Sequence, residues 1–135
     1  MSVVIDASTA LAAVLPDEDS VFARAAVAAA LDDQLVVPVL WAYEVQNGLL
    51  MALRRDRIDL ESAREALDAL RALRPQLRGP EALGHEFRLA HSHGLTAYDA
   101  AYVAVSLGTG ARLASNDLRL RGIAEQLGVA LLNTL

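Results

Sequence analysis

The chain contains no cysteine and no lysine, and its 12 basic residues are all arginine. The lack of cysteine excludes disulfides, thiol nucleophiles and zinc sites built on thiolates. The lack of lysine excludes every mechanism that depends on a lysine amine. Any enzymatic chemistry in this chain therefore has to be carried by other side chains.

Aromatic residues and positive charge are also scarce, whereas apolar residues are abundant. Aromatic side chains make up 4% of the sequence, charged ones 21% and hydrophobic ones 54%, and the formal net charge is −5. An acidic balance argues against binding of nucleic acid, since phosphate binders are usually basic. That objection weakens if several acids are metal ligands, because a bound cation inverts the local field.

No segment has the features of a membrane span or of a secretory signal. The apolar runs are far shorter than the roughly 18 residues needed to cross a bilayer. The N-terminus begins with a strand-like run instead of a basic region. We therefore expect a single domain, residues 1–135, in a cytoplasmic protein that does not contact a membrane.

Short apolar strands alternate with helical segments along the whole chain. Strands are expected at residues 2–5, 35–37, 111–114 and 129–132, with room for an edge strand between residues 75 and 80. Helices are expected at residues 8–15, 20–31, 39–55, 60–73, 81–91, 97–107 and 117–127, with Ser8 or Thr9 as the cap of the first. This alternation is typical of an α/β protein whose parallel sheet is covered on both faces.

Four carboxylates occur in apolar surroundings or directly after an apolar run: Asp6, Glu44, Asp99 and Asp117. A charge among apolar neighbours is costly unless it is paired or bound to a metal. Asp6 follows the first expected strand and Asp117 lies just past another. Because ligands of open parallel sheets bind beyond the carboxyl ends of the strands, these two acids are expected at one edge.

Each acid also has a purely structural explanation. Asp6 could begin a turn, and Glu44 could be a surface residue on a helix. Asp99 stands three residues after Thr96, in the pattern of a capping box. Asp117 could be a first-turn acid, which the helix dipole favours. Together, however, the four positions fit one architecture better than four unrelated accidents, so they predict a shared cation site.

Gathered carboxylates repel one another, and a bound cation relieves that repulsion. Ligands that are all oxygen select hard cations such as Mg²⁺ or Mn²⁺. Such an ion can activate water for attack on a phosphodiester, and this chemistry requires neither cysteine nor lysine. The sequence thus predicts metal-dependent hydrolysis of a phosphodiester.

Other acid-rich α/β proteins fit less well. Phospho-acceptor receiver domains need a lysine, phosphatases of the haloacid dehalogenase type typically do, and the P-loop motif Gly-Lys-Ser/Thr is absent. A binding module without catalytic activity, whose acids only cap helices, remains the alternative.

The remaining candidate residues give weaker signals. His91 and His93 are two positions apart and do not face each other on a helix, so a role at the helix end is favoured over metal binding. Tyr98 and Tyr102 are expected in the core rather than as platforms for nucleobases. The basic cluster at residues 54–57 is expected to be a solvated helix end, with phosphate contact as the alternative.

Four motifs resemble those of a known family: residues 4–8 (VIDAS), 44–49 (EVQNGL), 96–102 (TAYDAAY) and 113–120 (LASNDLRL). They span almost the whole chain. In order and spacing, the chain resembles the PIN domain and, within it, the VapC-type ribonuclease toxins of bacterial toxin–antitoxin pairs.

The resemblance implies a three-layer α/β/α PIN-like fold with a short, mostly parallel central sheet. It implies an Mg²⁺- or Mn²⁺-dependent endoribonuclease with RNA as its substrate. It also implies an antitoxin that blocks the site, a homodimer, and a larger hetero-oligomer of toxin and antitoxin.

The same resemblance assigns residues to a metal site. Asp6, Glu44, Asp99 and Asp117 would be the catalytic and metal-binding acids. Asp6 and Asp99 are expected as the main ligands, Glu44 as a ligand directly or through water, and Asp117 at a second position or orienting a water. Polar supporting positions are implied for Ser8, Asn47, Ser115 and Asn116. Arg74 and Arg78 are candidates for contact with RNA.

Overall fold

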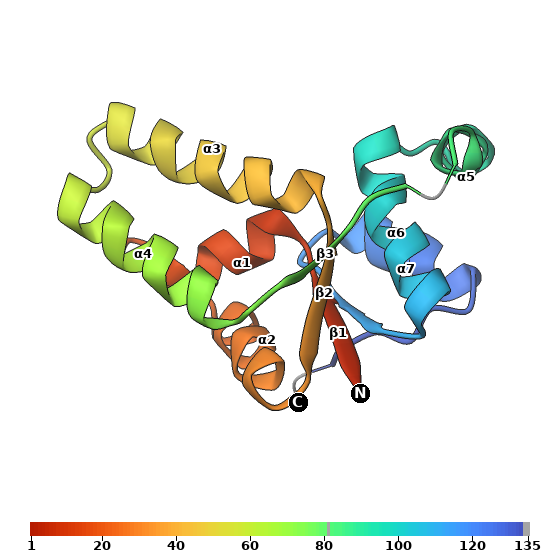
Figure 1. Ribbon diagram of the computed structural model, residues 1–135, viewed down its shortest axis with the longest axis horizontal. Coiled ribbons are helices and arrows are strands. Elements are labelled where there is room, and N and C mark those ends of the chain that lie inside the picture. The colour runs from red at the N-terminus through yellow and green to blue at the C-terminus, as the bar shows by residue number, and fades with distance from the viewer. Residues whose placement is uncertain (81, 134–135) are drawn as a thin grey trace.

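The computed structural model describes residues 1–80 and 82–133 and contains a parallel sheet at its centre (Figure 1). The strands are β1 (Ser2–Ile5), β2 (Gln34–Pro38), β3 (Gln76–Arg78) and β4 (Arg112–Ala114). Their order in the sheet is β3-β2-β1-β4, and every pairing is parallel. The central strand β1 is the most deeply buried, with Val3, Val4 and Ile5 all at 0% exposure.

Helices cover both faces of this sheet. They are α1 (Ala7–Val14), α2 (Val21–Asp32), α3 (Leu40–Arg54), α4 (Leu60–Ala72), α5 (His85–His93), α6 (Ala97–Thr109) and α7 (Leu118–Gln126). Figure 1 shows α1 to α4 on one side and α5 to α7 on the other. This arrangement confirms the predicted three-layer α/β/α fold. Among the helices described, none combines the length and the apolar character that a membrane crossing requires.

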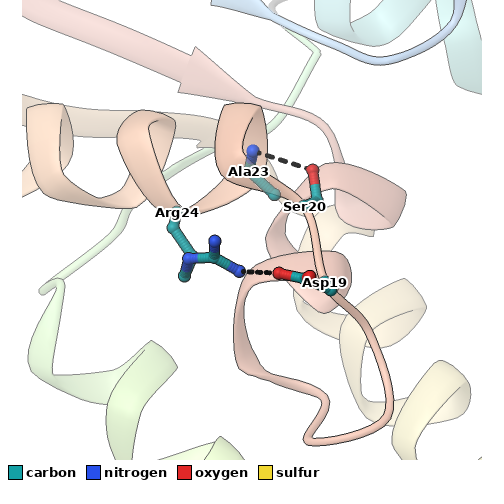
Figure 2. A network of polar contacts seen from close by, with 4 residues as sticks. All are labelled: Asp19, Ser20, Ala23 and Arg24. Atoms are coloured by element: carbon teal, nitrogen blue, oxygen red, sulfur yellow. Dashed lines mark hydrogen bonds and ion pairs between the residues drawn. The ribbon is translucent and has the colours of Figure 1, made fainter.

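Side-chain caps fix where many of the helices begin. In α2, the Ser20 hydroxyl accepts a hydrogen bond from the Ala23 N–H at 3.1 Å, and Arg24 pairs with Asp19 at 2.9 Å (Figure 2). Such a cap satisfies a first-turn N–H group that has no partner inside the helix. The other side-chain caps are Asp6, Asp59, Thr96 and Asp117. Two of the four candidate acids therefore also end up with a structural role.

The cap of the first helix differs from the prediction. Asp6, not Ser8 or Thr9, caps α1, and the helix begins at Ala7. The last helix follows the same pattern, because Asp117 is its cap and not its first residue. Both shifts move a candidate acid to the point where a strand ends and a helix begins.

Two predicted elements are shorter than expected. The helix predicted at 81–91 begins at His85, because Gly84 adopts a left-handed conformation with φ of 113° at the cap; residue 81 lies outside the described part. The strand predicted at 129–132 is reduced to one parallel bridge between Leu113 and Leu131. Its neighbour β4 is only 3 residues long and offers little strand to pair with.

Candidate active site

Asp6 lies at the carboxyl end of β1 and is nearly buried, at 7% exposure. Its Oδ1 accepts hydrogen bonds from the Thr9 N–H at 3.0 Å and from the Ser8 hydroxyl at 3.4 Å. Its Oδ2 accepts a hydrogen bond from the Ser115 hydroxyl. A buried carboxylate is tolerated only when such donors replace water. The Asp6 carboxylate is therefore held in one orientation.

Strand pairing brings Asp117 to the same edge. Ile5 of β1 pairs with Ala114 of β4, so Asp6 and Ser115 are neighbours just beyond the paired residues. The Ser115 hydroxyl, fully buried, donates to Asp6 and accepts from the Asp117 N–H at 3.0 Å. Asp117 itself accepts from the N–H groups of residues 119 and 120 as the cap of α7.

Asp99 approaches these two acids from the first turn of α6. Its N–H donates to the Thr96 hydroxyl at 3.0 Å, as the predicted capping pattern requires. Burial raises the pKa of Asp99, and the negative charges of Asp117 and Asp6 raise it further; the Thr96 hydroxyl and Arg119 act in the opposite direction. Asp6, Asp99 and Asp117 therefore lie close enough for their charges to repel one another.

Glu44 reaches the site from the exposed side of α3. Its Oε1 accepts a hydrogen bond of 2.6 Å from the hydroxyl of Tyr102, which is 2% exposed. Burial is the main cause that raises the pKa of Tyr102. The hydrogen bond to Glu44 and the negative charges of Glu44 and Asp6 raise this pKa further, and the backbone of Ala7 acts in the opposite direction. The tyrosine therefore stays protonated and acts as a hydrogen-bond donor. We call Asp6, Glu44, Asp99 and Asp117 the acid edge.

The sequence did not identify Tyr102 or Thr9 as part of this edge. Tyr102 is buried, as predicted, and it also anchors Glu44, whereas Tyr98, which was predicted in the core as well, is 67% exposed. Asn47, a predicted supporting position, is exposed. Thr9 is fully buried, and its hydroxyl accepts from the Asn116 N–H at 3.1 Å. A signal did exist, because each residue lies three positions after a candidate acid and hence on the same helical face.

Other predicted candidates lie away from the acid edge. Within the 54–57 cluster, Arg57 pairs with Asp17 at 2.8 Å and with Glu18 at 3.5 Å, which ties the end of the α3–α4 hairpin to the loop after α1. His91 stacks on Phe87 within α5, with ring centroids 6.4 Å apart. Arg57 and His91 therefore have structural contacts away from the acid edge.

The acid edge can supply a hard cation with only a few protein ligands. In residues 1–80 and 82–133, no group of three or more His, Cys, Asp or Glu side chains is arranged so that it could hold a metal ion. Mg²⁺, however, is commonly bound through one or two carboxylates, with waters and substrate phosphate as its other ligands. The donors here are all oxygen, and a cation would relieve the repulsion at Asp99. The edge therefore suits an ion held by few protein ligands.

Comparison with known proteins agrees with this geometry. The family profile described as "PIN domain" matches residues 3–126. Ribonuclease VapC3 of Pyrobaculum aerophilum is 38% identical over 124 residues, which cover 89% of this chain and 92% of that protein.

Further relatives point the same way. Ribonuclease VapC9 of Mycobacterium tuberculosis is also 38% identical, over 118 residues that cover 87% of each chain. The crystal structure of PAE2754 from Pyrobaculum aerophilum superposes with a TM-score of 0.70 at 25% identity, covering 94% of this chain and 86% of that one. The chain therefore belongs to the PIN-domain family and, within it, to the VapC ribonucleases.

Proposed function

We propose that this protein is a metal-dependent endoribonuclease that hydrolyses RNA phosphodiesters and acts as the toxin of a toxin–antitoxin pair. The observation that carries the proposal is the shared field of Asp6, Asp99 and Asp117 where β1, β4 and α6 meet. The names of the VapC relatives, which are ribonucleases, support the choice of RNA.

The four acids take different roles in this proposal. Asp6 and Asp99 bind Mg²⁺ or Mn²⁺, and Ser115, with Ser8, keeps the Asp6 carboxylate oriented. A divalent cation bound there would lower the pKa of a coordinated water and neutralise charge on the phosphate. Glu44 binds the ion directly or through a water, and Asp117, next to Asn116, orients a water or completes a second position.

RNA cleavage by the purified protein tests the proposal directly. Cleavage should require Mg²⁺ or Mn²⁺, stop with EDTA, and be lost in Asp6→Asn and Asp99→Asn. Asp19→Asn is the matched control, because Asp19 is 93% exposed and pairs with Arg24 beside α2, away from the acid edge (Figure 2). Cleavage that survives both EDTA and the two substitutions would contradict the metal mechanism. A wild type that cleaves no RNA would leave the alternative, an acid-lined binding module without catalytic activity.

The antitoxin is proposed as a protein with basic side chains that covers the acid edge. An edge of four carboxylates on a chain of net charge −5 offers strong attraction for arginine or lysine. Expression of the protein in the cytoplasm of a bacterial host should arrest growth, and co-expression of the antitoxin should restore it and yield a toxin–antitoxin hetero-oligomer. Growth arrest by Asp6→Asn as strong as by the wild type would contradict the link between toxicity and cleavage.

A homodimer is proposed through an apolar groove between the β3–α5 segment and α6. Two adjoining hollows of about 490 and 330 Å³ share Arg78, Gly79, Glu86 and Val105. Leu83 and Phe87 stand beside them with 97% and 71% exposure. In a two-fold dimer the same patch meets itself, and the exposed apolar side chains of one copy would fill the hollows of the other.

Light scattering after size-exclusion chromatography tests the dimer. The wild type should have twice the chain mass of 14.4 kDa, and Phe87→Glu should have the monomer mass. Val21→Glu on α2, where Val21 is 72% exposed, is the control that should remain dimeric. A monomeric wild type, or a dimer unaffected by Phe87→Glu, would remove this interface from the proposal.

A further inference from the structure

Tyr102 joins two of the helices around the acid edge, α6 and α3. It lies on α6, one turn after Asp99, and its hydroxyl donates to Glu44 on α3. One buried hydroxyl therefore links the helix that carries Asp99 to the helix that carries Glu44.

Among the residues that the structure describes, Tyr102 is the one hydrogen-bond partner of the Glu44 carboxylate. Glu44 lies on an exposed part of α3, next to Tyr43, which is 71% exposed. A glutamate on such a surface samples several rotamers, and it loses that freedom when a fixed group binds it. The 2.6 Å bond from Tyr102 is this fixed group, since the tyrosine is 2% exposed and its ring is held by the core.

We infer that Tyr102 is a positioning residue of the proposed ribonuclease: it holds Oε1 of Glu44 so that Oε2 faces the ion or its bound water. The inference rests on the proposed function. With Oε1 engaged by the tyrosine, Glu44 acts through a single oxygen. Tyr102 thereby performs the orienting role that outer partners of metal-binding carboxylates commonly have.

A purely structural role makes a different prediction. A buried tyrosine usually finds a partner for its hydroxyl, and Glu44 could serve only that purpose. In that case Tyr102→Phe would change the melting temperature and leave metal binding unchanged. Metal affinity measured without substrate therefore separates the two roles.

The test compares Tyr102→Phe with Tyr98→Phe, a matched change one turn earlier on α6, where Tyr98 is 67% exposed. Calorimetric titration of the full chain with Mn²⁺ should show binding about tenfold weaker in Tyr102→Phe and unchanged binding in Tyr98→Phe. In RNA cleavage, kcat should fall while KM stays near the wild-type value, since the buried hydroxyl does not reach RNA. Mn²⁺ binding within twofold of the wild type, together with an unchanged kcat, would overturn the inference.

Variants of Glu44 complete the test. In a Glu44→Ala background, adding Tyr102→Phe should weaken Mn²⁺ binding no further, because the residue through which Tyr102 acts is gone. Glu44→Asp keeps the charge on an exposed helical face but shortens the reach to Tyr102, so it should reproduce the loss even if Tyr102→Phe fails to fold. Equal losses from Tyr102→Phe with and without Glu44, or wild-type binding in Glu44→Asp, would contradict the inference. A wild type that neither binds Mn²⁺ nor cleaves RNA would instead remove the proposed function itself.

Discussion

The half of the acid edge around Asp6 and Asp117 differs from the half around Glu44 in what holds its carboxylates. Asp6 and Asp117 cap helices, and Ser115 links the Asp6 carboxylate to the backbone of Asp117 through hydrogen bonds. Glu44 is held by one side-chain hydrogen bond from Tyr102 of α6, which lies 58 positions later in the sequence. The first half is fixed by local backbone geometry, whereas the second depends on how α3 and α6 are packed.

This difference separates stability from catalysis. Groups that cap helices contribute to folding and to the site at once, so their loss should affect both. A group held only by a tertiary hydrogen bond on an exposed face should affect the site more than the fold. Substitutions around the acid edge should therefore range from large to small effects on stability.

Asp6→Ala should have the largest effect. It removes the cap of α1, which costs about 1 kcal/mol, and it removes the acceptor of the buried Ser115 hydroxyl, which costs about another 1–3 kcal/mol. RNA cleavage should be lost as well. Urea unfolding and cleavage assays measure the two effects, and full stability in Asp6→Ala would contradict the dual role of this carboxylate.

Ser115→Ala should destabilise the protein by about 1–3 kcal/mol, because the buried Asp6 carboxylate loses a donor. Cleavage should fall about 10- to 100-fold through loss of orientation. Ser106→Ala is the matched control: Ser106 is 2% exposed, and its hydroxyl has no hydrogen-bond partner among the residues described. Ser106→Ala should be neutral or stabilising, and equal losses from both serines would show that only packing matters.

Asp99→Asn should abolish cleavage yet stabilise the metal-free protein at neutral pH. The pKa of Asp99 is raised in the folded state, so its contribution to stability is full below its unfolded pKa of about 3.9 and is lost as the pH rises through the folded pKa. The difference in melting temperature between variant and wild type, measured in EDTA, should therefore grow from acid to neutral pH. A difference that does not change with pH would argue against repulsion among the acids.

Asn47→Ala should have the smallest effect. Asn47 is exposed one turn after Glu44, and surface substitutions usually change stability by less than about 0.5 kcal/mol. Cleavage should fall less than in Tyr102→Phe, since the structure gives the role of holding Glu44 to the tyrosine. Kinetics of the two variants side by side make the comparison, and a larger loss in Asn47→Ala would reverse it.

The three-layer fold was predictable from the sequence because its strands and helix starts are set by residues close together in the chain. Continuous apolar runs predicted β1, β2 and β4, and Thr96 and Asp99 predicted the start of α6. The predicted helix at 81–91 and the predicted strand at 129–132 were wrong in extent. The start of the helix was set by the left-handed conformation of Gly84. The strand was limited by the short length of β4, with which it would pair.

The sequence alone determined that Asp6 and Asp117 would meet at one edge, because strand ends and helix caps are encoded by neighbouring residues. It also determined which chemistry is available. The chain has no thiol and no lysine amine, so the candidate site consists of carboxylates, whose ligand atoms are all oxygen. Only the tertiary structure decided that Tyr102 holds Glu44 and that Asp99 shares the field of two other acids. Such contacts depend on how distant helices cross, and hydrogen bonding over that separation leaves no periodic signal in the sequence.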